Sequence, residues 1–136
     1  MYPQVIWIEK TVYATGAPKP VGPYNQAVEA GAFIFVSGQL PIEPETGQII
    51  TGGTRAQTAR IMENIRAILK ASGCDFNDVL QCTVCLASMA SFKDFNAKYE
   101  RYFTKDFPAR VTVGAELMQG ILVEISVVAC KRRRLP

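Results

Sequence analysis

The 136-residue sequence contains no histidine. Without imidazole it cannot form a Ser-His-Asp or Cys-His triad, a histidine general base, or a zinc site that needs imidazole ligands. Any chemistry must therefore use arginine, carboxylates, tyrosine, serine, threonine, cysteine, backbone groups and water.

Long apolar runs are also absent. No stretch approaches the roughly 20 consecutive apolar residues that a bilayer-spanning helix needs. The first residues show neither a basic segment followed by an apolar run nor an arginine-rich presequence, and we therefore expect a cytoplasmic protein with no membrane partner. We find no linker or repeat, so residues 1–136 are expected to form a single domain that buries its core without metals or disulfides.

Cysteine is sparse, with four residues in the chain. Cys82 and Cys85 have the spacing of a redox motif, but the apolar segment 79–86 that contains them is typical of a strand. Residues three apart on a strand point to opposite faces, so these two thiols cannot easily pair. We expect reduced, buried cysteines.

The net charge of +3 is small, and much of it lies in a basic tail at residues 130–136. Such a tail could contact nucleic acid or anionic lipid. The favoured interpretation is a solvated chain end after the last strand, because no aromatic residues are interleaved with its four basic residues.

Apolar periodicity predicts the secondary structure. Strands are expected at 5–8, 33–36, 79–86, 109–115 and 121–130. Thr54 and Gln57 have capping-box spacing, and apolar residues then repeat at helical period until Gly73. A second helix is expected to begin at Ser91, with a stripe of aromatic residues, and to end before Pro108. This order predicts an α+β fold with two helices packed on one face of a sheet.

Two of the predicted strands, 79–86 and 122–130, are largely apolar on both faces. Two helices can cover only one side of the sheet, and the other side would be a large exposed apolar patch unless another surface covered it. Self-association is the simplest cover, so we expect an obligate homo-oligomer.

Arg110 and Glu124 are the candidate catalytic pair. Alternation in segment 109–115 places Arg110 and Thr112 on its polar face, and Glu124 is the one charged residue in the following strand. If these strands form a hairpin turning near 117–118, Arg110 lies opposite Glu124 on the same side. Two interpretations then remain open: a structural ion pair, or a site where a small anionic substrate binds the guanidinium.

Three further residues are weaker candidates. Asn96 lies at the edge of the aromatic stripe of the second helix, where a partly buried amide needs hydrogen-bond partners. Tyr24 follows a proline-rich loop, and Gly38 ends a strand where backbone can approach a ligand closely. Purely structural roles are the alternative for each.

Several segments resemble the RidA/YjgF/UK114 family in order and spacing: GPYNQA at 22–27, SGQLP at 37–41, PETG at 44–47, FNAKY at 95–99, FPAR at 107–110 and LVEI at 122–125. The resemblance implies a chorismate-mutase-like α+β fold assembled as a homotrimer, with ligand clefts between subunits. It also implies hydrolysis of reactive enamine and imine acids, such as 2-aminoacrylate and 2-iminobutanoate, to 2-oxo acids and ammonia, without a cofactor or a metal.

The resemblance also assigns roles to individual residues. Arg110 would bind the substrate carboxylate and Glu124 would orient or activate water, while Tyr24 and Asn96 would line the cleft and Gly38 would supply backbone contacts. The segment 116–120 departs from the family, because it lacks the proline and basic residues common in relatives. Two alternatives remain: an RNA-directed role as an endoribonuclease or translation inhibitor, and a non-catalytic trimer that binds small acids or acts like a chaperone.

Overall fold

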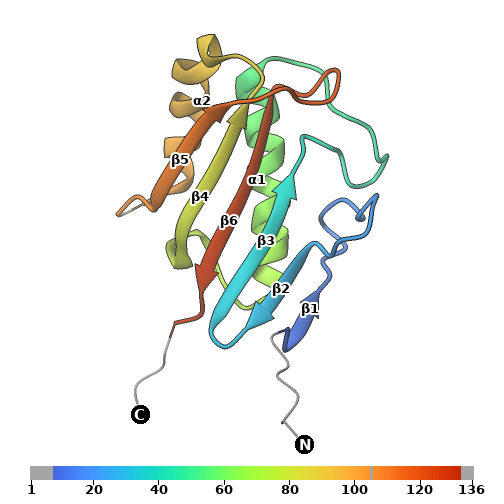
Figure 1. The fold of residues 1–136 in the computed structure, drawn as a ribbon, viewed down its shortest axis with the longest axis vertical. Helices are drawn as coiled ribbons and strands as arrows, with labels where there is room; N and C mark the ends of the chain where they lie inside the picture. The colour runs from blue at the N-terminus through green and yellow to red at the C-terminus, as the bar shows by residue number, and fades with distance from the viewer. Residues whose placement is uncertain (1–7, 105, 133–136) are drawn as a thin grey trace, which may run out of the picture.

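The computed structural model describes residues 8–104 and 106–132. Its centre is a six-stranded mixed sheet in the order β1-β2-β3-β6-β4-β5, with both α-helices on one face (Figure 1). The strands are β1 Lys10–Val12, β2 Ala27–Ala30, β3 Phe33–Gln39, β4 Val79–Leu86, β5 Ala109–Gly114 and β6 Val123–Cys130. The helices are α1 Thr54–Ala71 and α2 Phe92–Tyr99, with short 3-10 turns η1 Phe76–Asp78, η2 Met89–Ser91 and η3 Glu100–Tyr102.

The sheet is antiparallel except at one edge, where β4 and β5 run parallel. Parallel neighbours require a crossover connection, and α2 lies in the chain between these two strands. The crossover places α2 over the β4–β5 edge, while α1 lies behind the middle of the sheet (Figure 1).

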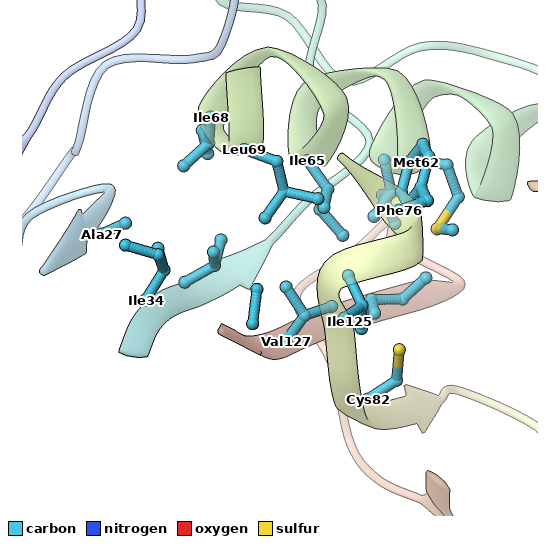
Figure 2. Packing of buried hydrophobic residues seen from close by; sticks show 14 of the residues in the cluster. Ala27, Ile34, Met62, Ile65, Ile68, Leu69, Phe76, Cys82, Ile125 and Val127 are labelled. Atoms are coloured by element: carbon cyan, nitrogen blue, oxygen red, sulfur yellow. The ribbon is translucent and has the colours of Figure 1, made fainter. Parts of the chain in front are cut away.

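The core lies between α1 and the sheet. One face of α1 carries fully buried side chains at helical spacing, and they point toward buried side chains of β3 and β6 (Figure 2). These residues are Ile61, Ile65, Ile68 and Leu69 on the helix, and Ile34, Ile125 and Val127 on the strands. The predicted α+β architecture with two helices on one face is confirmed.

The start of α1 differs from the prediction. Gly53 is the N-cap and no side chain caps the helix, so the capping box predicted from Thr54 and Gln57 is wrong. The amide of Gln57 instead donates to the carbonyl of Gly120 and accepts from the N–H of Leu122, both at 2.8 Å. These bonds fix the start of β6 to the helix. The predicted end is confirmed, because Gly73 has a φ of 78° directly after the C-cap.

The other predicted boundaries hold in part. Ser91 directly precedes α2, as predicted, but makes no side-chain cap bond, and the helix ends at Tyr99 before the turn η3. The strand predicted at 5–8 falls mostly outside the described residues, and β1 begins at Lys10. The strand β2 was not predicted.

The sheet face away from the helices carries exposed apolar side chains. Phe33 and Phe35 on β3 are each 44% exposed, and Val111 and Val113 on β5 are 48% and 43% exposed. The exposed apolar side chains thus lie on β3 and β5, whereas the strands predicted to be apolar on both faces, 79–86 and 122–130, carry polar residues such as Gln81, Thr83, Glu124 and Ser126 on this side. Among the described residues, no helix is long and apolar enough to cross a membrane.

The four cysteines are free. Cys82 is fully buried among core residues, while Cys85 lies on the opposite face of β4 and is half-buried. The prediction that these two thiols point to opposite faces is confirmed.

The described part of the basic tail is engaged with acidic side chains. Lys131 forms an ion pair with Glu29. Arg132 binds Asp78 at 2.7 Å and Asp75 at 2.8 Å. Residues 133–136 lie outside the described residues.

Candidate functional site

Arg110 and Glu124 do not form the predicted cross-strand pair. Their strands are not neighbours, because β4 lies between β5 and β6, and the predicted hairpin is wrong. Arg110 is in register with Cys82 of β4, whereas Glu124 is in register with Cys85. Because Cys82 and Cys85 point to opposite faces, Arg110 lies on the helix side of the sheet and Glu124 on the open side.

Arg110 lies on a layer of aromatic rings from α2. The central carbon of its guanidinium is 5.6 Å from the ring centroid of Phe92, 5.5 Å from that of Phe95 and 5.0 Å from that of Tyr99. Among the described residues, no carboxylate forms an ion pair with this guanidinium. The positive charge is therefore held by rings, and its donors remain available to a ligand.

A cavity of about 480 Å³ opens beside Arg110. It is lined by Asn96, Tyr99, Glu100, Phe107, Pro108 and Arg110, which come from α2, η3 and the entry to β5. The predicted site residues Asn96 and Arg110 are thus brought together. A cavity that combines apolar walls with a free cation is typical of a site for a small organic anion.

Buried polar atoms around this cavity lack partners. Oδ1 of Asn96, the hydroxyl of Tyr99 and Oγ1 of Thr112 are buried without a hydrogen bond among the described residues. Unpaired buried polar atoms are costly and rare, and two of these residues, Asn96 and Tyr99, line the cavity together with Arg110. Burial raises the pKa of Tyr99, so its hydroxyl stays protonated and can donate.

Glu124 and Gly38 form a second group on the open side of the sheet. A Cβ on Gly38 would overlap Oε1 of Glu124 and lie 3.1 Å from its Cδ. The register between β3 and β6 shifts at this point, between Val36 and Gln39. The missing side chain of Gly38 therefore leaves the space that the Glu124 carboxylate occupies.

Tyr24 lies near Gly38. The two residues line one shallow depression, and the Tyr24 hydroxyl accepts a hydrogen bond from the N–H of Val21 at 3.3 Å. Gln26, which sequence reasoning gave no role, fixes this loop, because its buried amide accepts from the N–H of Ala14 and donates to the carbonyl of Pro18.

The predicted site residues therefore fall into two groups: Asn96 and Arg110 beside the cavity, and Tyr24, Gly38 and Glu124 away from it. The first group offers a cation and unpaired polar atoms, and the second offers a carboxylate. Within residues 8–104 and 106–132, no cluster of three or more His, Cys, Asp or Glu side chains could hold a metal ion.

The aromatic layer under Arg110 is the feature that sequence reasoning missed. Phe92, Phe95 and Tyr99 were assigned to the core stripe of α2 because of their spacing. Their helix connects β4 to β5, so it had to pack over the strand that carries Arg110. The position of this helix between β4 and β5 in the sequence was therefore the signal that could have predicted the contact with Arg110.

Comparison with known proteins agrees with this description. The model of the endoribonuclease L-PSP family matches residues 2–131. A RutC family protein of Pyrococcus horikoshii is 44% identical over 91% of this chain and 99% of its own length. The mouse protein named 2-iminobutanoate/2-iminopropanoate deaminase is 42% identical over 90% of this chain and 91% of its own length.

Solved structures show the same fold. The crystal structure of a putative endoribonuclease from Thermotoga maritima aligns with a TM-score of 0.88 and 42% identity, covering 93% of this chain and all of that one. The names of these relatives differ, but the match extends over nearly the whole chain. The chain therefore belongs to the endoribonuclease L-PSP family, which includes the RidA/YjgF proteins that its motifs resemble.

Proposed function

We propose that this protein hydrolyses 2-imino acids and their enamine tautomers, such as 2-iminobutanoate and 2-aminoacrylate, to 2-oxo acids and ammonia. The observation that carries the proposal is the free guanidinium of Arg110, which lies in a cavity beside the unpaired Oδ1 of Asn96. The mouse relative bears the name of this activity.

The chemistry needs little beyond these groups. Arg110 binds the substrate carboxylate through paired hydrogen bonds, and Oδ1 of Asn96 accepts an N–H from the imine nitrogen. Water attacks the carbon of the protonated imine while the Glu124 carboxylate accepts a proton from that water. The resulting carbinolamine takes this proton on nitrogen, and its hydroxyl returns a proton to Glu124 as the C–N bond breaks, which releases ammonia and leaves the 2-oxo acid. An imine carbon is already electrophilic, so orientation supplies much of the rate enhancement.

We infer that two copies of the chain complete each site, in a homotrimer. Arg110 and Glu124 cannot meet within one chain, because they lie on opposite faces of the sheet. The open face also exposes apolar side chains of β3 and β5, and β5 is an edge strand. A second copy packed there would cover this surface and bring its Glu124 group toward the Arg110 cavity.

The first test is a coupled assay. A pyridoxal-phosphate-dependent threonine dehydratase releases the imine, and the purified protein is expected to accelerate formation of 2-oxobutanoate. Arg110→Lys keeps the charge but loses the planar fork, so we expect a smaller loss than in Arg110→Ala. Absence of acceleration by the wild-type protein would overturn the proposed activity, and binding of 2-oxobutanoate without turnover would indicate a small-acid-binding protein instead.

A further inference from the structure

Among the described residues, two arginines lie over aromatic rings, and one of the two also pairs with a carboxylate. Arg66 is 5.1 Å from the ring of Phe76 and 5.7 Å from that of Tyr102, and it also pairs with Glu63 at 3.2 Å. Arg110 contacts rings alone among the described residues. Arg66 therefore makes a structural contact, whereas the charge of Arg110 has no carboxylate partner among the described residues.

The difference matters for ligand binding. A carboxylate partner would occupy the same in-plane N–H groups that a substrate carboxylate needs, and the substrate would have to displace it. A ring stabilises the cation through its face and leaves the in-plane donors free. Aromatic rings are thus the kind of neighbour that can hold a guanidinium in one place without competing with an anionic ligand.

The rings come from one rigid element. Phe92, Phe95 and Tyr99 lie at helical spacing on α2, and the rings of Phe95 and Tyr99 are 5.2 Å apart. Phe95 and Tyr99 are buried and also support the core, whereas Phe92 is 37% exposed at the end of the layer. Phe92 is therefore the ring whose contact with Arg110 can be changed with little effect on the core.

The geometry points to the aromatic face of α2, with Phe92 at its accessible end, as a positioning device that holds the Arg110 guanidinium toward the cavity in the absence of an ion pair. Phe92 and Phe95 are then positioning residues, because they act through Arg110 and do not line the cavity. This inference rests on the proposed role of Arg110 in binding a carboxylate ligand.

The test is a graded series at Phe92: Phe92→Leu, Phe92→Tyr and Phe92→Trp. Cation–π attraction is strongest for tryptophan and is lost with leucine. We expect Phe92→Leu to raise both the KM for the imine substrate and the Kd for 2-oxobutanoate by roughly fivefold, the order of one such contact. The kcat should change less than KM, because the lost contact holds substrate and transition state alike. Phe92→Tyr should keep the affinity for 2-oxobutanoate close to that of the wild type, and Phe92→Trp should match or exceed the wild-type affinity.

Tyr102→Leu is the matched control, because it removes a ring from Arg66, away from the cavity. It is expected to lower the melting temperature while leaving KM and Kd unchanged. Wild-type binding by Phe92→Leu, or equal weakening in all three Phe92 variants, would overturn the positioning role. If the wild type and the Phe92 variants bind 2-oxobutanoate in this graded order but the wild type does not hydrolyse imines, the proposed activity fails and the positioning role stands. If it neither binds nor hydrolyses, both fail.

Discussion

The side chains of Arg110 and Glu124 extend from opposite faces of one sheet, with β4 between their strands. Within a single chain, neither can neutralise or orient the other. Arg110 instead lies on the rings of α2, and Glu124 fills the space that Gly38 leaves. A site that uses both charges requires two copies of the chain.

Gly38→Ala should strongly reduce activity without unfolding the protein. The new Cβ would overlap the Glu124 carboxylate and displace it, while the exposed side of the sheet can absorb the added methyl group. We expect kcat to fall at least about a hundredfold, the lower range for loss of a general base. Gly53→Ala is the control, since a Cβ there meets no atom within 4 Å. Equal activity of the two variants would contradict the placement of Glu124.

Gln57→Leu should destabilise the chain by about 2 kcal/mol, because it leaves the Gly120 carbonyl and the Leu122 N–H without partners. Chemical denaturation measures this loss. Gln48→Leu serves as the control and is expected to be near neutral, because Gln48 is exposed and its side chain makes no hydrogen bond among the described residues. A Gln57 variant as stable as the control would show that these two bonds do not hold β6 to α1.

Arg132→Ala should lower the melting temperature more than Arg55→Ala. Arg132 binds two carboxylates, and the Asp78 side chain is only 2% exposed, so its charge would lose its cationic partner inside the fold. Arg55 pairs with Asp94 where both side chains are 60% exposed, and such pairs contribute little. Thermal melts of the two variants compare the partly buried ion pair with the exposed one. Equal melting temperatures would contradict a structural role for Arg132 in the tail.

Stability should decrease above about pH 9. Burial raises the pKa of the Cys82 and Cys74 thiols above their ordinary value of 9.0, and burial also raises the pKa of Tyr99. These groups stay protonated in the folded state while they ionise in the unfolded chain, so their contribution is complete below pH 9 and is lost as the pH rises. Urea denaturation between pH 7 and pH 10 measures the slope.

Cys82→Val removes one of these groups and nearly preserves its volume, so the slope should become shallower while stability at pH 7 changes little. An unchanged slope would show that the Cys82 thiol does not contribute to the alkaline loss of stability.

The sequence predicted the bounds of the strands better than the order of the strands in the sheet. The bounds of β4 match the predicted 79–86, and the alternation around Arg110 correctly separated its face from that of Val111. These predictions follow from local periodicity, which reflects burial on one side of each strand. Asn96 was predicted to lie partly buried at the edge of the aromatic stripe, and its Oδ1 is indeed buried.

The order of strands was not predicted correctly, because local pattern does not reveal which strand is inserted between two others. Residues 115–122 cross over β4 instead of forming a tight turn, so β5 pairs with β4 and not with β6. A helix between β4 and β5 is typical of parallel neighbours, and that rule would have placed β5 beside β4. The hairpin assumption paired Arg110 with Glu124 on one face, whereas the structure places them on opposite faces of the sheet.

The central claim is that Arg110 of one copy and Glu124 of another form each site, and mixing two inactive variants tests it most directly. Arg110→Ala and Glu124→Gln are purified alone and after co-expression as mixed oligomers. In a cyclic assembly, about one quarter of the interfaces then combine an intact Arg110 with an intact Glu124. Imine hydrolysis restored to about one quarter of the wild-type rate is the predicted result. Activity no higher than the sum of the two separate variants would contradict it.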